Sequence, residues 1–325
     1  MNRFAKSLTA AAVSALALAA PAVAETWNMP VPYGDTTFHT VNIREFAADV
    51  AEATEGALEI EVHSAGSLFP HGEIKNAVRS RQVPIGEFFL STLSNEDAAF
   101  GVDSQPFLAA SYEEAEKLWS AQKPVITELF AEQDLMPLFS VPWPAQGLYT
   151  EEEVLTVDDL AGLRFRAYNA ALEKFAQLAK AAPVQVEAPD IPQAFSTGQV
   201  DAMMTSPSTG ANSKAWDFVS TYTAVDAWLP KNIVVVNKRM FDRLPEDVQA
   251  AVLEAAAEAE TRGWEMSVAE ADAKKAVMAE NGMAIVTPSD ELMSGLKDIG
   301  ATMMEDWKTS ASEAGQKVLA DYEAE

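Results

Sequence analysis

The sequence contains no cysteine in 325 residues and only three histidines. The absence of cysteine excludes disulfides, zinc–thiolate sites and thiol nucleophiles. His39, His63 and His71 show neither the H-E-x-x-H motif nor another metal-ligand spacing, so no metal site is expected. The G-x-S-x-G, Walker A and G-x-G-x-x-G motifs are also missing. The sequence therefore gives no reason to expect an enzyme, a metal or a cofactor.

Long apolar runs are missing as well, except at the N-terminus. Residues 1–24 begin with Arg3 and Lys6, continue with a run rich in Ala, Leu and Val, and end in Ala-Val-Ala before Glu25. This layout is typical of a secretory signal peptide cleaved after Ala24. The apolar run is too short for a membrane anchor, and no cysteine follows it for lipid attachment. The sequence therefore predicts a mature protein in the bacterial periplasm.

Positive charge is scarce, with 23 Lys and Arg against 49 Asp and Glu. The formal net charge is −26, and it becomes −28 without the predicted signal peptide, which holds two basic residues and no acidic one. Such a charge repels nucleic acid and anionic lipid, so neither is an expected partner. It also repels anionic solutes. A carboxylate ligand would therefore need a local cation in its site.

The segment 159–208 has a pattern typical of parallel α/β structure. Short apolar runs alternate with helical ones, so strands are expected at 163–167, 184–186 and 200–205, with helices at 169–180 and 191–196. In such a sheet, ligands bind beyond the carboxyl ends of the strands.

Two arginines lie in the first strand of this segment. By the two-residue period of a strand, Arg164 and Arg166 share the face opposite Leu163 and Phe165. A strand covered on both faces cannot hide a guanidinium unless an anion meets it. Arg166 is therefore the first candidate for a ligand anchor. The alternative is pairing with one of the many neighbouring acidic side chains.

The same segment resembles a known family. Leu160 to Arg166 fits L-x-G-[LM]-[KR]-[IVF]-R, and Thr197 to Ala202 fits [TQ]-G-x-V-D-[GA]. Their order and spacing are similar to those of the periplasmic solute receptors of TRAP (tripartite ATP-independent periplasmic) transporters, the dicarboxylate-receptor-like family. The resemblance extends through nearly the whole mature chain. It implies a two-lobed α/β periplasmic binding protein fold, a ligand cleft at the hinge and a carboxylate-binding role for Arg166.

The remaining chain supplies further elements of this fold. Strands are expected at 26–31, 58–63, 84–90, 135–141 and 232–237, and helices at 37–53, 71–81, 112–132 and 301–324. The resemblance implies one long helix over 244–280 that spans both lobes, and the alternative is two helices interrupted near Gly263. Residues 25–143 plus 232–272 are expected to form lobe I, and residues 144–231 plus 273–325 lobe II.

The candidate ligand-binding residues follow from strand ends, the crossover and the resemblance. Only one of Phe88 and Phe89 can face the cleft. Where many relatives have Gly-Gln-Glu-Asn-Pro, this chain has Met203 and Met204 followed by hydroxyls, which predicts a less polar pocket. Aromatic side chains at three of the positions favour an aromatic or bulky apolar carboxylate. The expected set is Arg166, Tyr33, Phe88, Ser91, Trp143, Asn169, Thr205, Ser206, Trp228 and Asn232.

Several of these residues have a purely structural alternative. Tyr33 can be an ordinary loop tyrosine, Trp143 can pack the hinge, and Asn169 can cap a helix. The predicted function is a receptor that closes around a small organic anion and delivers it to the integral-membrane subunits of a TRAP permease. Two alternatives remain open, a periplasmic sensor component and a lyase or hydrolase on this fold.

Overall fold

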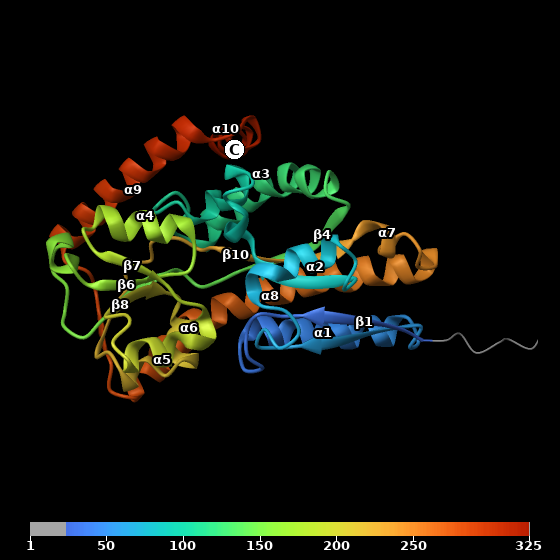
Figure 1. Cartoon of the computed structure of the whole chain (residues 1–325), viewed down its shortest axis with the longest axis horizontal. Coiled ribbons are helices and arrows are strands. Elements are labelled where there is room, and N and C mark those ends of the chain that lie inside the picture. The colour runs from blue at the N-terminus through green and yellow to red at the C-terminus, as the bar shows by residue number, and fades with distance from the viewer. Residues whose placement is uncertain (1–23, 325) are drawn as a thin grey trace, which may run out of the picture.

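A computed structural model describes residues 24–324 (Figure 1). The predicted signal peptide, except for Ala24, lies outside the described residues. Within the described part, the chain forms two lobes on three β-sheets, with helices on their outer faces. None of the helices in residues 24–324 is long and apolar enough to span a membrane.

The first lobe contains two small sheets. In one, β1 (Glu25–Pro30) runs parallel to β2 (Leu58–His63), and α1 (Phe38–Ala53) connects them. In the other, the central strand β10 (Lys231–Asn237) runs antiparallel to β3 (Ile85–Phe89) and β4 (Leu135–Pro142). The expected strands are confirmed to within one or two residues, and β2 coincides with its prediction. The helices of this lobe are α2 (Ile74–Arg79), which follows a 3-10 turn at His71–Glu73, α3 (Tyr112–Ala131) and α7 (Lys238–Phe241).

The second lobe is built on a six-stranded sheet with the order β11-β9-β5-β8-β6-β7. Its strands are β5 (Gly147–Thr150), β6 (Arg164–Ala167), β7 (Ala182–Gln185), β8 (Ala202–Thr205), β9 (Thr221–Thr223) and β11 (Ala284–Val286). Strand β6 runs parallel to both β7 and β8, as the pattern of residues 159–208 predicts. The helices are α4 (Ala170–Leu178), α5 (Ile191–Ser196), α6 (Pro207–Asn212) and α9 (Asp290–Ser310). The carboxyl ends of β6, β7 and β8 point toward the first lobe.

One helix of 35 residues, α8 (Glu246–Glu280), connects the two lobes (Figure 1). Near its start Val252 is buried in the core of the first lobe, and near its end Met278 is buried in the core of the second. The predicted long helix is confirmed, and the alternative of a break near Gly263 is excluded. Gly263 lies within the helix, at a point where a Cβ would stand only 2.3 Å from Val141 Cγ2. The glycine therefore permits close packing of α8 on β4.

The C-terminal helix α10 (Glu313–Ala324) does not lie in the lobe in which the sequence predicts it. Residues 273–325 were expected in lobe II, but α10 packs against α3 of the first lobe. Val318 and Leu319 share an apolar cluster with Leu118 and Val125 of α3. The apolar face of α10 is thus buried on the first lobe, so the last twelve described residues return to it.

Candidate ligand-binding site

A small cavity lies between the two lobes and holds about 410 Å³ of space not filled by protein atoms. The first lobe contributes Tyr33, His71, Phe89 and Trp143. The second lobe contributes Gln146, Arg166, Tyr168, Glu187, Ala188, Thr205, Ser206 and Thr209. The cavity therefore lies at the carboxyl ends of β6, β7 and β8, where parallel sheets bind ligands.

Arg166 is the cation of the cavity and is only 2% exposed. Its Nε donates to the carbonyl oxygen of Val186 at 3.0 Å, whereas its buried Nη1 has no hydrogen-bond partner. Burial lowers the pKa of Arg166 to about 10, although Tyr168 and Glu187 oppose the shift. The side chain is therefore still a cation at neutral pH. A buried guanidinium with an unused donor is a binding site for an anion.

Arg164, two residues earlier in the same strand, has a different environment. Its side chain is half exposed, and its Nε donates to Asp201 Oδ2 at 2.7 Å. The interpretation of a strand arginine paired with a neighbouring acid thus applies to Arg164. Arg166 has no hydrogen bond to an acidic side chain within the described residues, which leaves it available for a ligand.

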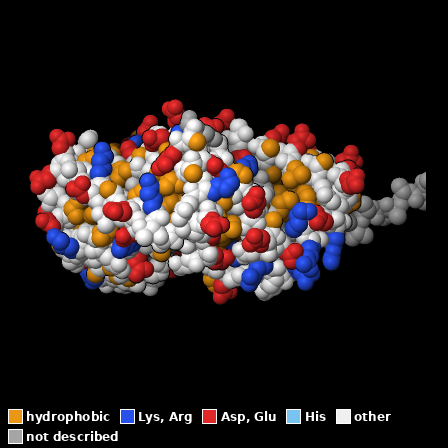
Figure 2. All heavy atoms as spheres, turned by 90° about the horizontal axis from the view of Figure 1, so that it is seen from above, with side chains coloured by type: hydrophobic (Ala, Val, Ile, Leu, Met, Phe, Trp, Pro, Cys, Tyr) orange, Lys and Arg blue, Asp and Glu red, His pale blue; other side chains and the backbone are white. Residues whose placement is uncertain are grey.

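The negative charge of the surface makes the buried cation Arg166 necessary for attracting an anion. Figure 2 shows acidic side chains distributed over one face of the molecule, with basic side chains among them, several of them toward the lower right of the view. The net charge of −26 is therefore a diffuse repulsive field for an anion. Attraction has to come from within the cavity.

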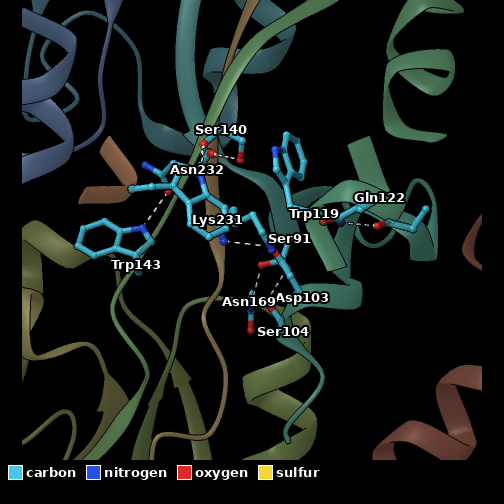
Figure 3. A network of polar contacts seen from close by, with 12 residues as sticks. Ser91, Asp103, Ser104, Trp119, Gln122, Ser140, Trp143, Asn169, Lys231 and Asn232 are labelled. Atoms are coloured by element: carbon cyan, nitrogen blue, oxygen red, sulfur yellow. Dashed lines mark hydrogen bonds and ion pairs between the residues drawn. The ribbon is translucent and has the colours of Figure 1, made fainter. Parts of the chain in front are cut away.

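Two aromatic walls of the cavity are held by one amide. Asn232 Oδ1 accepts a hydrogen bond from the Tyr33 hydroxyl at 3.2 Å. The same oxygen accepts from Trp143 Nε1 at 2.9 Å (Figure 3). Its Nδ2 donates to Glu87 Oε1 at 2.8 Å. The Tyr33 and Trp143 rings meet edge to face, with centroids 4.9 Å apart. Asn232 does not line the cavity itself but fixes the orientation of both rings.

Hydroxyl groups line the cavity after β8. Thr205 ends the strand and Ser206 is the N-cap of α6, where the Ser206 Oγ accepts from the backbone N–H of Thr209 at 3.1 Å. Met203 and Met204 are buried in the apolar clusters on opposite sides of the sheet. The prediction that their thioether groups make the pocket less polar is therefore wrong, because neither methionine lines the cavity. Strand alternation points one to each face of the sheet, whereas the cavity lies beyond the end of the strand.

Two of the expected aromatic residues do not line the cavity. Phe88 is in the core of the first lobe, where its ring lies 6.2 Å from that of Phe130. Its neighbour Phe89 occupies the cavity wall instead, as the alternation of a strand allows. Trp228 is in the core of the second lobe, 6.2 Å from the ring of Phe175. Among residues 24–324, Trp143 is thus the single tryptophan that lines the cavity.

Ser91 and Asn169 join the lobes beside the cavity rather than lining it (Figure 3). Asn169 Oδ1 caps α4 by accepting from the backbone N–H of Leu172 at 2.8 Å. Its Nδ2 donates to Ser91 Oγ at 2.8 Å. The capping interpretation of Asn169 is confirmed, and the same side chain also forms a contact between the lobes.

Two titratable residues that the sequence did not single out complete the cavity. The backbone N–H of Phe89 donates to His71 Nε2 at 2.9 Å. His71 Nδ1 therefore carries a proton and donates to Glu187 Oε2 at 3.3 Å. This hydrogen bond lowers the pKa of Glu187, with a smaller contribution from Arg166. The position of Glu187 two residues after the end of β7, at the same edge as Arg166, is the signal that could have identified it.

Gln146 and Tyr168 are two further polar residues of the cavity that the sequence did not single out. The Tyr168 hydroxyl donates to Gln146 Oε1 at 3.1 Å, and Gln146 Nε2 donates to the carbonyl oxygen of Pro144 at 2.7 Å. Burial raises the pKa of Tyr168, so its hydroxyl stays neutral. The guanidinium of Arg166 lies over the Tyr168 ring, 5.1 Å from its centroid. This contact helps to hold the buried cation.

Comparison with known proteins identifies the family. Residues 29–314 match the model of the family described as bacterial extracellular solute-binding protein, family 7, and the chain belongs to this family. Three solved structures are similar over nearly the whole chain. DctP7 of Bordetella pertussis, an extracytoplasmic solute receptor binding pyroglutamic acid, is 44% identical, with a TM-score of 0.91 over 92% of this chain and 100% of its own.

The other two structures are similar to this chain over nearly the same extent. DctP6 of Bordetella pertussis, also a receptor binding pyroglutamic acid, is 39% identical with a TM-score of 0.91 over 93% of this chain and 100% of its own. A TRAP solute-binding protein from a marine metagenome, specific for pyroglutamate, is 40% identical with a TM-score of 0.90 over 93% of this chain and 99% of its own. The protein is therefore an extracytoplasmic solute receptor of the TRAP type.

Proposed function

We propose that the solute of this receptor is pyroglutamate, a five-membered lactam that carries one carboxylate. The observation that carries the proposal is the buried Arg166, whose Nη1 has no partner and is available to the carboxylate. Three receptors that are 39–44% identical to this chain are described as binding pyroglutamate, which supports the same choice here. A planar guanidinium can bind a carboxylate through two hydrogen bonds.

The charge of the cavity also favours a monocarboxylate. Arg166 is the only Lys or Arg side chain among the described residues that line the cavity. A dicarboxylate would bring a second negative charge without a second cation and next to Glu187, which is costly in a buried site. The sequence alone favours an aromatic carboxylate, but Phe88 and Trp228 lie in the cores of the lobes. A small ring can still pack against the aromatic side chains that do line the cavity, Tyr33, Phe89, Trp143 and Tyr168.

The proposal includes the location and the working cycle. Residues 1–24 direct the chain to the periplasm and are removed. The proposed lobe I comprises residues 25–143, 232–272 and α10, and the proposed lobe II comprises residues 144–231 and 273–310. The lobes close on the solute, and the closed form is the one that the permease recognises. The solute is released unchanged, since the receptor performs no reaction on it.

A thermal-shift and calorimetric screen of residues 25–325 tests the proposal. The panel contains L-pyroglutamate, glucuronate, succinate, 2-oxoglutarate and phenylpyruvate. A ligand at 100 times its dissociation constant adds about 2.7 kcal/mol to the free energy of unfolding. We expect stabilisation by pyroglutamate and its recovery unchanged by mass spectrometry. Stabilisation by another acid with none by pyroglutamate would reject the assignment, and a changed compound would show turnover.

A further inference from the structure

The cavity contains a second charged side chain whose sign is opposite to that of the expected anchor. Glu187 follows β7, Arg166 lies in β6, and both side chains line the same cavity. A carboxylate side chain in such a site weakens the attraction of the site for an anionic solute. The ligand must therefore compensate for this repulsion with a favourable contact to Glu187. Because an ionised carboxylate only accepts hydrogen bonds, that contact has to come from a hydrogen-bond donor of the ligand.

Glu187 has the capacity and the orientation for such a donor. Its side chain is 47% exposed, and the hydrogen bond to Oε2 comes from His71 Nδ1 at 3.3 Å. A carboxylate has about four acceptor positions, so capacity remains for a ligand. The Phe89 N–H, bound to His71 Nε2 at 2.9 Å, fixes the tautomer in which Nδ1 faces Glu187 with its proton. His71 is thus a positioning residue for Glu187.

We propose that Glu187, held by His71, accepts a hydrogen bond from a ring N–H of the solute and so selects an N–H-bearing monocarboxylate. This inference rests on the proposed function and assigns its specificity. The same carboxylate repels the second carboxylate of a linear dicarboxylate. A neutral N–H is the better match than an ammonium, because a buried ammonium requires several acceptors and a lactam nitrogen requires one.

The discriminating pair of ligands is L-pyroglutamate and 3-oxocyclopentane-1-carboxylate, in which CH₂ replaces the ring N–H. Sites built to bind a donor reject analogues that lack it, because the acceptor that the ligand covers is then left unpaired. We expect wild-type receptor to bind pyroglutamate at least about 100-fold more tightly than the ketone. In Glu187→Met, which removes the acceptor at similar size, we expect the ratio to fall below about tenfold.

Control variants separate this effect from a loss of charge or fold. Glu173 is an exposed acid of α4 outside the cavity, so Glu173→Met removes the same charge and should leave the ratio unchanged. Glu187→Gln removes the negative charge but keeps an acceptor. This variant should retain part of the preference for pyroglutamate and gain affinity for glutarate. Circular dichroism spectra of all variants check that the fold is retained.

The outcomes distinguish this inference from the proposed function. Equal wild-type affinities for the lactam and the ketone, or a ratio that persists in Glu187→Met, would overturn the role of Glu187 while pyroglutamate remains the solute. L-Proline binding as tightly as pyroglutamate would overturn the choice of a neutral donor. Absence of pyroglutamate binding, measured with correctly folded wild-type protein, would overturn both.

Discussion

Glu187 Oε2 lies 3.3 Å from His71 Nδ1, and this hydrogen bond joins the two lobes across the ligand cavity. A second contact between the lobes, from Asn169 Nδ2 to Ser91 Oγ at 2.8 Å, lies beside the cavity. Both contacts require the lobes to be closed. Any ligand that bridges Arg166 and the first lobe therefore favours the same closed state that these hydrogen bonds stabilise.

Replacing Arg166 with Met should raise the stability of the ligand-free receptor while abolishing binding. The buried Nη1 has no partner, so the charge costs free energy until a ligand arrives. We expect the free energy of unfolding to rise by roughly 1–3 kcal/mol. Chemical denaturation without ligand measures the gain, and calorimetry measures the loss of binding. A destabilised Arg166→Met variant that still binds the solute would show that Arg166 has only a structural role.

Arg166→Lys tests the geometry of the same contact. Lysine keeps the charge but lacks the planar fork, so affinity should fall by roughly 10- to 150-fold, the equivalent of one charge-assisted hydrogen bond. Arg164→Met is the matched control in the same strand. Its partner Asp201 and its half-exposed side chain predict a loss of less than about 1 kcal/mol in stability and no change in affinity. Similar losses of affinity in both variants would point to damage to β6 rather than to loss of an anchor.

Acidification should weaken binding through Glu187. The hydrogen bond from His71 lowers the pKa of Glu187 in the closed state. The contribution of this carboxylate is therefore complete above its ordinary pKa, roughly 4.3, and is lost as the pH falls through the lowered value. We expect the dissociation constant of wild type to rise more steeply between about pH 5 and pH 3.5 than that of Glu187→Gln. Parallel profiles would assign the loss to the ligand carboxylate alone.

The sequence revealed the candidate anchor more readily than the rest of the candidate site. Arg166 is conspicuous because a charge within an apolar strand requires a partner, and this reasoning needs no tertiary contact. Glu187 and His71 lie in polar segments next to turns, where charged residues are common and solvated. Their proximity depends on the closure of one lobe on the other, which no local pattern encodes.

The orientation of Phe88 and Phe89 shows a second limit. Every residue of β3 is buried, so the alternation of polar and apolar residues that would identify the cavity face is absent. By contrast, β2 alternates between buried and exposed residues at its start, and its predicted bounds are those of the structure. Local patterns therefore define elements well where one face meets water, and poorly where both faces are buried.

The buried pair Lys231–Asp103 should be worth far more than a surface pair of the same length. Lys231 Nζ lies 3.5 Å from Asp103 Oδ2, and both side chains are at most 1% exposed (Figure 3). Burial raises the pKa of Asp103 and lowers that of Lys231, so each charge depends on the other. Lys231→Met leaves Asp103 buried and unpaired, and should cost about 3–5 kcal/mol of stability.

A double variant and a surface control complete this test. Asp103→Asn combined with Lys231→Met removes both charges and keeps an acceptor for the backbone N–H of residue 231, so most of the stability should return. Lys308 lies 3.5 Å from Glu323 with both side chains more than half exposed. Lys308→Met should therefore cost less than about 1 kcal/mol of stability. Urea titrations of all these variants measure the changes in the free energy of unfolding. Equal costs for Lys231→Met and Lys308→Met would mean that burial does not strengthen the pair.

Gly263→Ala should destabilise the receptor even though alanine is the better helix former. Helix propensity alone favours the change by about 1 kcal/mol. The new Cβ, however, would stand 2.3 Å from Val141 Cγ2 and 2.7 Å from Asn42 Nδ2, so α8 would have to move away from β4 and α1. Ala257 is exposed on the same helix. Ala257→Gly should therefore cost only the difference in helix propensity between alanine and glycine, about 1 kcal/mol. We expect Gly263→Ala to lose more stability than Ala257→Gly. A stabilised Gly263→Ala variant would show that α8 can be displaced without cost, and that this glycine does not set the spacing between the long helix and the first lobe.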